Sequence, residues 1–179
     1  MRTIALSLLA FFTLISFSCE DELDRLTKFT ITSKSTFTLP ATTVVDIPLA
    51  IGTPEVPVNN EQEFDNNNSR TDLIESAKLT SLVLNITSPD DGNFDFLNEI
   101  EIIIDAEGLD EQVIASRTEI PEDQSTSIEL NVKETELRPY LQNDSYSLRV
   151  RAKVDKTINS EYKIESTSRI FIDAEILGI

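Results

Sequence analysis

Residues 145–154 read Ser-Tyr-Ser-Leu-Arg-Val-Arg-Ala-Lys-Val, a stretch in which every second side chain is apolar. Successive side chains of an extended strand point to opposite faces of a sheet, so this alternation places one set on a core face and the other in water. Arg149, Arg151 and Lys153 belong to the water-facing set. The stretch therefore predicts a β-strand with one buried face.

The same period of two continues along the chain on both sides of this strand. Its apolar members are rich in β-branched residues and Phe, which favour strands. With residues 113–116 added, the pattern predicts eight or nine strands. The expected inward sets are Phe29 and Ile31; Phe37 and Leu39; Val45, Ile47 and Leu49; Leu82, Leu84 and Ile86; Ile100, Ile102, Ile104 and Ala106; Ile128, Leu130 and Val132; and Tyr162, Ile164, Ile170, Ile172, Ala174 and Ile176.

Turn residues separate these strands, as in the Ser-Pro-Asp-Asp-Gly of residues 88–92. Only two short helical turns are expected, at residues 72–77 and 134–141. Many strands with so little helix favour antiparallel sheets packed face to face. We therefore predict an all-β fold: a single immunoglobulin-like β-sandwich over residues 28–179.

Three apolar residues, Val83, Ile103 and Ile114, fall on the expected outward side of central strands. Two interpretations remain open at this point. In the first, loops or a helical turn cover this face of the sheet, or the alternation is shifted by one residue so that the three side chains point inward. Alternatively, they form a partner-binding face, because contiguous exposed apolar patches often mark interfaces.

The composition excludes several classes of function. The 179 residues carry a net charge of −17, which opposes binding to nucleic acid. The chain has no His and one Cys, so it lacks an imidazole base, a His-ligated metal and an internal disulfide. Its many paired carboxylates, such as Glu122-Asp123, look like ordinary solvated acids. We expect a protein without enzymatic activity.

The N-terminus has the pattern of an export signal. Arg2 is followed by an apolar run over residues 4–17, which is too short for the roughly 20 residues that span a bilayer. The only cysteine, Cys19, comes directly after Ser18. A sole Cys at the cleavage position resembles a bacterial lipoprotein precursor, and this implies cleavage of residues 1–18 and acylation of Cys19.

The lipoprotein box usually has Leu three places before the Cys, where this chain has Ser16. Lipoproteins of the Bacteroidota tolerate such boxes. The alternative is ordinary signal-peptidase cleavage near Ser18, which would leave a free thiol at the new N-terminus. An exposed free thiol is a liability in an oxidising compartment, which favours lipidation.

Residues 19–27 form an acidic tether that begins at the cysteine. Four of the five residues after Cys19 are acidic: Glu20, Asp21, Glu22 and Asp24. Such a run buries little apolar area and is typical of a solvated spacer. Acids directly behind a lipidated Cys also resemble the surface-export signal of Bacteroidota lipoproteins. The resemblance implies an outer-membrane lipoprotein displayed on the cell surface in preference to the periplasmic face.

The turn after the fourth inward set spaces Asp91, Asn93 and Asp95 as the first, third and fifth ligands of a calcium loop. Phe96 and Ile102 stand where an EF-hand needs Gly and Glu. A looser Ca²⁺ site and an ordinary polar turn are the two interpretations. The covalent lipid apart, we expect no other cofactor.

A hydrophilic loop over residues 59–70 carries one aromatic residue, Phe64, followed by Asp65 and Asn66. Long loops of compact domains are often binding loops. Phe64, Asp65 and Asn66 are therefore candidates for contact with a partner, and the alternative is that Phe64 packs back onto the sandwich.

The pattern as a whole resembles uncharacterised envelope lipoproteins of the Bacteroidota. We expect a lipid-anchored, non-enzymatic module that binds an outer-membrane or envelope protein. Two or more acyl chains are enough for stable anchoring, and protein binding is what remains once the missing His and Trp weigh against catalysis and sugar stacking. The alternative is a surface module for glycan or calcium, which the absence of Trp makes weaker for sugar stacking.

Overall fold

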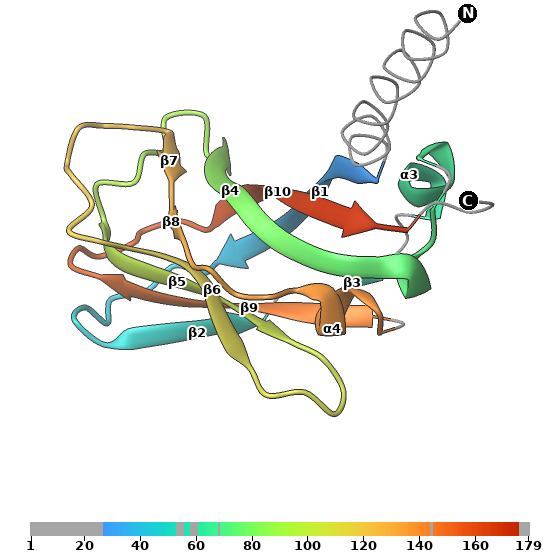
Figure 1. Cartoon of the computed structure of the whole chain (residues 1–179). Coiled ribbons are helices and arrows are strands. Elements are labelled where there is room, and N and C mark those ends of the chain that lie inside the picture. The colour runs from blue at the N-terminus through green and yellow to red at the C-terminus, as the bar shows by residue number, and fades with distance from the viewer. Residues whose placement is uncertain (1–26, 53–55, 58–60, 68, 144, 176–179) are drawn as a thin grey trace, which may run out of the picture.

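The computed structural model describes residues 27–52, 56–57, 61–67, 69–143 and 145–175. These residues form two antiparallel β-sheets that lie face to face, visible as two layers in Figure 1. The predicted all-β sandwich is confirmed. Its strands are β1 (Lys28–Leu39), β2 (Pro48–Gly52), β3 (Val56–Pro57), β4 (Ile74–Ser88), β5 (Leu97–Asp105), β6 (Gln112–Thr118), β7 (Ser127–Glu129), β8 (Asn131–Val132), β9 (Ser145–Val154) and β10 (Tyr162–Ala174), and its helical turns are α3 (Glu61–Asn66), η1 (Thr71–Leu73) and α4 (Arg138–Leu141).

The first sheet has the strand order β1–β10–β4–β7. The last strand, β10, pairs with the first strand along its whole length, from Lys28 opposite Asp173 to Leu39 opposite Tyr162. Its other side pairs with β4, the longest strand. The sheet therefore depends on contacts between segments that are far apart in the sequence.

The second sheet has the order β2–β9–β5–β6–β8, and β3 also pairs with β9. Strand β9 behaves as its alternation predicts, because its apolar set faces the core and its basic set faces outward. On the outer face, Arg151 binds Glu101 at 2.7 Å and Arg149 binds Glu111 at 2.5 Å. These ion pairs are exposed, so each contributes little to stability.

One short segment joins the two sheets. Strand β7 pairs with β4 of the first sheet, and β8 pairs with β6 of the second. Between them, buried Leu130 donates its backbone N–H to the carbonyl of Leu82 at 2.9 Å. The alternation of Ile128, Leu130 and Val132 was expected to form one strand, and in the structure it passes from one sheet to the other.

A β-bulge decides the position of two of the three outward apolar residues. The pairing of β5 with β6 shifts between Ile102 and Ile103, so that Ile102 lies opposite Ala115 and Ile103 opposite Val113. Ile114 is the extra residue, and it is buried in the core together with Ala115. The expected alternation is therefore wrong by one residue at Ile114.

Ile103 does lie on the outer face, yet only 1% of it is exposed. Its neighbours across the strands are Val113 on β6 and Arg149 on β9, and directly opposite residues share one face of a sheet. Arg149 lies directly opposite Ile103, and long basic side chains at such positions can cover apolar surface with their stems. Val83 is half-buried. These residues form no exposed apolar face.

The expected strand over Val45, Ile47 and Leu49 begins later than predicted. Asp46 has a φ of 61°, which interrupts the extended backbone, and β2 begins only at Pro48. Leu49 packs against the core, whereas Val45 and Ile47 are exposed. The prediction that Val45 and Ile47 face the core is wrong, because a left-handed residue between them breaks the alternation.

Both helical turns are shorter than expected. The turn predicted at residues 72–77 is the single turn η1, because β4 starts at Ile74 and pairs with β10. The turn predicted at residues 134–141 is α4, which has Pro139 in its first turn, where the missing N–H is tolerated. Within the described ranges, no helix is long and apolar enough to cross a membrane.

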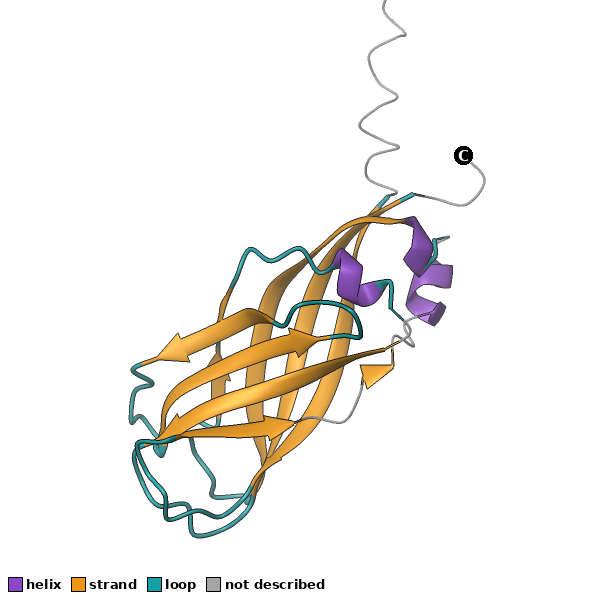
Figure 2. Ribbon diagram, turned by 90° about the horizontal axis from the view of Figure 1, so that it is seen from below, coloured by secondary structure: helices purple, strands orange, loops and turns teal. Residues whose placement is uncertain are grey.

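The start of β1 and the end of β10 lie at the same end of the sandwich. The N–H of Ala174 binds the carbonyl of Thr27 at 3.0 Å, and α3 lies at this end as well (Figure 2). Four loops gather at the opposite end, which we call the distal end: residues 40–47, 89–96, 119–126 and 155–161.

The core makes a direct stability prediction. Leu84 of β4 is fully buried between its neighbours Ser166 and Ile128. Leu84→Ala is expected to lower the free energy of unfolding by about 2 to 5 kcal/mol, because it removes buried methyl groups and leaves a cavity. Urea denaturation measures the change. Glu75→Ala, an exposed position on the same strand, should cost less than about 0.5 kcal/mol, and equal losses from both variants would contradict the assigned core.

Candidate functional site

The predicted anchor and tether lie outside the described residues. This applies to Cys19 and to Glu20, Asp21, Glu22 and Asp24, and to the signal peptide over residues 1–18. The structure places the point at which the described chain begins, Thr27, at the end of the sandwich that also holds α3.

Phe64 packs onto the sandwich. It projects from α3, only 1% of it is exposed, and its ring meets the ring of Phe29 edge to face, with centroids 5.4 Å apart. Asp65 and Asn66, the other two candidate contact residues, are exposed. The aromatic residue of this loop therefore attaches α3 to β1, and its two polar neighbours remain accessible.

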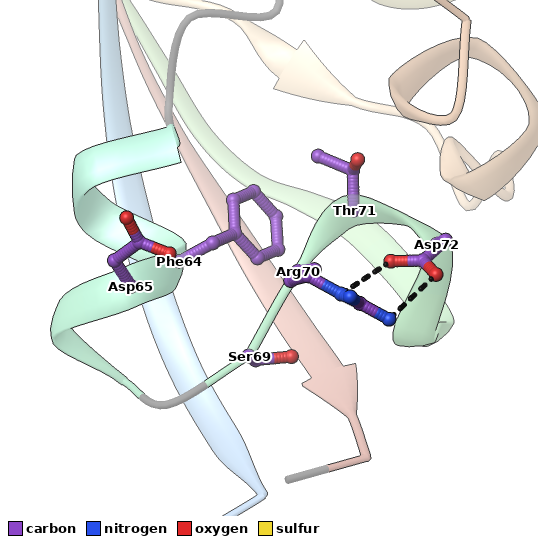
Figure 3. Close-up of a pocket in the computed structure, with 6 residues that line it drawn as sticks. All are labelled: Phe64, Asp65, Ser69, Arg70, Thr71 and Asp72. Carbon is purple, nitrogen blue, oxygen red and sulfur yellow. Dashed lines mark hydrogen bonds and ion pairs between the residues drawn. The ribbon is translucent and has the colours of Figure 1, made fainter. Parts of the chain in front are cut away.

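A cavity of about 250 Å³ lies beside α3 and is lined by Phe64, Asp65, Ser69, Arg70, Thr71 and Asp72 (Figure 3). The hydroxyl of buried Ser69 donates a hydrogen bond to the carbonyl of Glu175 at 2.8 Å, which links Ser69 to the residue that follows β10. Arg70 forms two hydrogen bonds with Asp72, from Nε at 3.1 Å and from Nη2 at 3.0 Å.

The chemistry of this cavity does not favour a small-molecule site. Ligand pockets usually enclose roughly 300 to 1,000 Å³ with a mainly apolar lining. Here the charged groups Arg70 and Asp72 neutralise each other, and the one large apolar side chain, Phe64, is buried against Phe29. The polar groups around the cavity bind within the chain: Ser69 binds the carbonyl of Glu175, and Arg70 binds Asp72.

Two of the three residues of the candidate calcium turn, Asn93 and Asp95, accept backbone hydrogen bonds within the fold. Asn93 Oδ1 accepts the N–H of Asp95 at 3.1 Å, and Asp95 Oδ1 accepts the N–H of Gln124 at 2.8 Å. Burial raises the pKa of Tyr162, and the nearby carboxylate of Asp91 raises it further. In the described part of the chain, His, Cys, Asp and Glu side chains form no group of three that would hold a metal.

The turn over residues 88–92 depends on Gly92. A Cβ at this position would lie 2.9 Å from the carbonyl oxygen of Pro89 and 2.9 Å from the ring of Tyr162. The N–H of Gly92 also binds the Pro89 carbonyl at 3.0 Å. The close approach of backbone and ring leaves no room for a side chain at this position, which lies in the turn that the sequence predicted.

Glu136 is a positioned carboxylate that the sequence showed only as one acid among many. Its oxygens accept the N–H of Ala77 at 2.7 Å, the hydroxyl of Ser76 at 2.8 Å and the N–H of Arg138 at 3.0 Å. Burial alone would raise the pKa of this carboxyl group, but these hydrogen bonds and the charge of Lys78 stabilise the ionised form and lower it overall. Glu136 fastens the segment before α4 to β4, which is a structural role.

The chain matches no protein-family profile and no curated protein sequence. Among solved structures it is similar to a chain of Turnip Yellow Mosaic Virus, with 12% identity over 84% of this chain and 98% of that chain and a TM-score of 0.30. It is also similar to the decameric BFDV capsid protein, with 8% identity over 81% and 98% and a TM-score of 0.35. TM-scores this low carry no conclusion about activity or partners.

The Glu136 carboxylate predicts a specific pH dependence. Its pKa is lower in the folded chain than the ordinary value of 4.5, so its stabilisation is complete above that value and is lost as the pH falls through the lower folded pKa. Glu136→Gln should lower the free energy of unfolding by about 1 kcal/mol at pH 7 and by less below pH 4.5. Denaturation across this range measures both. Glu134→Gln is the matched control, and an identical pH profile for the two variants would contradict the assignment.

The turn at Asp95 predicts the response to calcium. Since Asp95 and Asn93 already accept backbone N–H groups, we expect the melting temperature to be the same with millimolar Ca²⁺ and with chelator. Asp95→Ala should lower stability by about 1 kcal/mol in both conditions, because the N–H of Gln124 loses its acceptor. A rise in melting temperature with Ca²⁺ that Asp95→Ala abolishes would establish the calcium site instead.

Proposed function

We propose that the protein is a lipid-anchored, non-enzymatic binding module of a Gram-negative outer membrane, displayed on the cell surface, that engages an envelope protein. The sequence around Cys19, with its apolar signal and the acids Glu20, Asp21, Glu22 and Asp24, supports the anchor and the display. The lack of His supports a role without acid–base catalysis.

The observation that carries this proposal is the position of the first strand. Thr27 and Ala174 are hydrogen-bonded at one end of the sandwich, so an anchor on Cys19 would be attached at this end. The four distal loops then lie at the end farthest from the point of attachment. A sandwich held in this way presents its loops to partners, and loops on a rigid scaffold are the usual binding elements of such domains.

The anchor is tested by Cys19→Ala in the full chain. Without the thiol no acyl chain can be attached, so the protein should move from the membrane fraction to the soluble fraction and should no longer incorporate labelled palmitate. Fractionation of cells and metabolic labelling measure the two effects.

Ser16→Leu, which restores the usual residue of the lipoprotein box, is the matched control and should stay in the membrane fraction. Treatment of intact cells with protease reports the side of the membrane on which the domain lies. A Cys19→Ala protein that remains membrane-bound would overturn the proposed anchor.

A further inference from the structure

Three large apolar side chains are exposed in one short loop of the distal end. They are Val44, Val45 and Ile47, which are 45%, 37% and 58% exposed. All three belong to the loop over residues 40–47 between β1 and β2. Exposed apolar residues that stand singly are ordinary, whereas exposed apolar residues that gather at one place often belong to an interaction site.

Hydrogen bonds fix the backbone of this loop. Thr42 and Ile158 exchange both of their backbone hydrogen bonds at 2.9 Å, and the N–H of Asp46 binds the carbonyl of Val154 at 2.7 Å. The N–H of Val44 also binds the hydroxyl of Thr42 at 3.1 Å. These bonds hold the backbone at Thr42, Val44 and Asp46 in the conformation in which the three apolar side chains are exposed.

The conformation of Asp46 adds to this argument. Its φ of 61° lies in the left-handed region, which few residues other than Gly adopt and which Asp tolerates. This single residue stops the strand alternation that would have placed Val45 and Ile47 inward. The loop thus presents its apolar side chains in a preorganised form, which lowers the entropy cost of binding.

The four distal loops are joined to one another. Phe94 donates its N–H to the carbonyl of Ser125, and Asp155 donates to that of Phe96, at 2.9 and 3.1 Å. Lys156 and Glu122 form an ion pair across two of the loops. The exposed apolar group therefore lies on a connected surface at the distal end, which Figure 2 shows opposite the start of β1.

This surface is strongly acidic. Its four loops contain nine Asp and Glu residues and one basic residue, Lys156. Eight of the nine acids are exposed, and Asp95 is half-buried. The acids are Asp46, Asp90, Asp91, Asp95, Glu119, Glu122, Asp123, Asp155 and Glu161.

We propose that Val44, Val45 and Ile47 form the apolar centre of a docking surface for a protein whose contact face is an apolar recess bordered by Lys and Arg. The acidic surroundings attract a basic rim and orient it before contact. The same charge disfavours a second copy of this chain and an anionic lipid surface, since both would bring negative charge to the acidic loops. This inference deepens the proposed function and rests on it.

The test places a photocrosslinking amino acid at Val45 of the full chain, in cells that naturally make the protein. A second chain carries the same probe at Glu107, an exposed position in the loop between β5 and β6 at the opposite end. We expect a protein adduct from position 45 and none from position 107. The crosslinked partner peptide should contain apolar residues next to Lys or Arg.

Ile47→Ser combined with the probe at Val45 should lower the adduct yield about tenfold, because a buried Ile side chain is lost from the contact. Asp90→Asn with Asp155→Asn should weaken the dependence of the yield on salt, whereas Asp110→Asn, at the opposite end, should leave it unchanged. Each variant should melt at the wild-type temperature, since all four side chains are exposed.

Several outcomes would overturn the proposal: no adduct from position 45, an adduct between two copies of this chain, an adduct with lipid, equal yields from positions 45 and 107, or a contact peptide without Lys and Arg. Membrane fractionation of the same cells reports on the anchor separately. An incorrect docking surface and an incorrect anchor therefore give different results.

Discussion

The burial of one set of side chains between two sheets is the constraint on which this domain depends. With a single Cys in the sequence there is no internal disulfide, so apolar packing must hold the layers together. Neither sheet can bury its inner face alone. The first and last strands of the domain, β1 and β10, pair with each other. Residues 127–132 pass from the first sheet to the second and connect them at one edge.

Because the inner faces are apolar, the charged side chains lie on the outer faces of the sheets and in the loops. The outer face of β9 carries Arg149 and Arg151, each paired with a carboxylate, and Ile103 is buried beside them. The distal loops carry many acids and a single basic residue, and they surround the only group of large exposed apolar side chains in the described ranges. The molecule therefore combines a sheet face whose apolar residue is buried with one end that exposes apolar and acidic side chains.

Alternation predicted the sheets well where the strands are regular and failed where a single residue breaks them. The inward set of β9 is buried as expected, whereas the bulge at Ile114 and the left-handed Asp46 each displace the pattern. Such breaks arise from pairing with another strand or from loop hydrogen bonds, which the local sequence does not encode. For the same reason the sequence left open whether Phe64 contacts a partner or packs onto the sandwich, and the ring of Phe29, far away in the chain, decides for packing.

The sequence by itself determined the fold class, the acidity of the chain and the expectation of a lipid anchor at Cys19, because each depends on local pattern or composition. The tertiary structure alone decided that Thr27 and Ala174 meet at one end of the sandwich and that Val44, Val45 and Ile47 are exposed in a loop at the other. It also decided that Glu136 binds the backbone of Ala77. These features depend on which distant segments meet, and that is settled only when both sheets bury their apolar faces together.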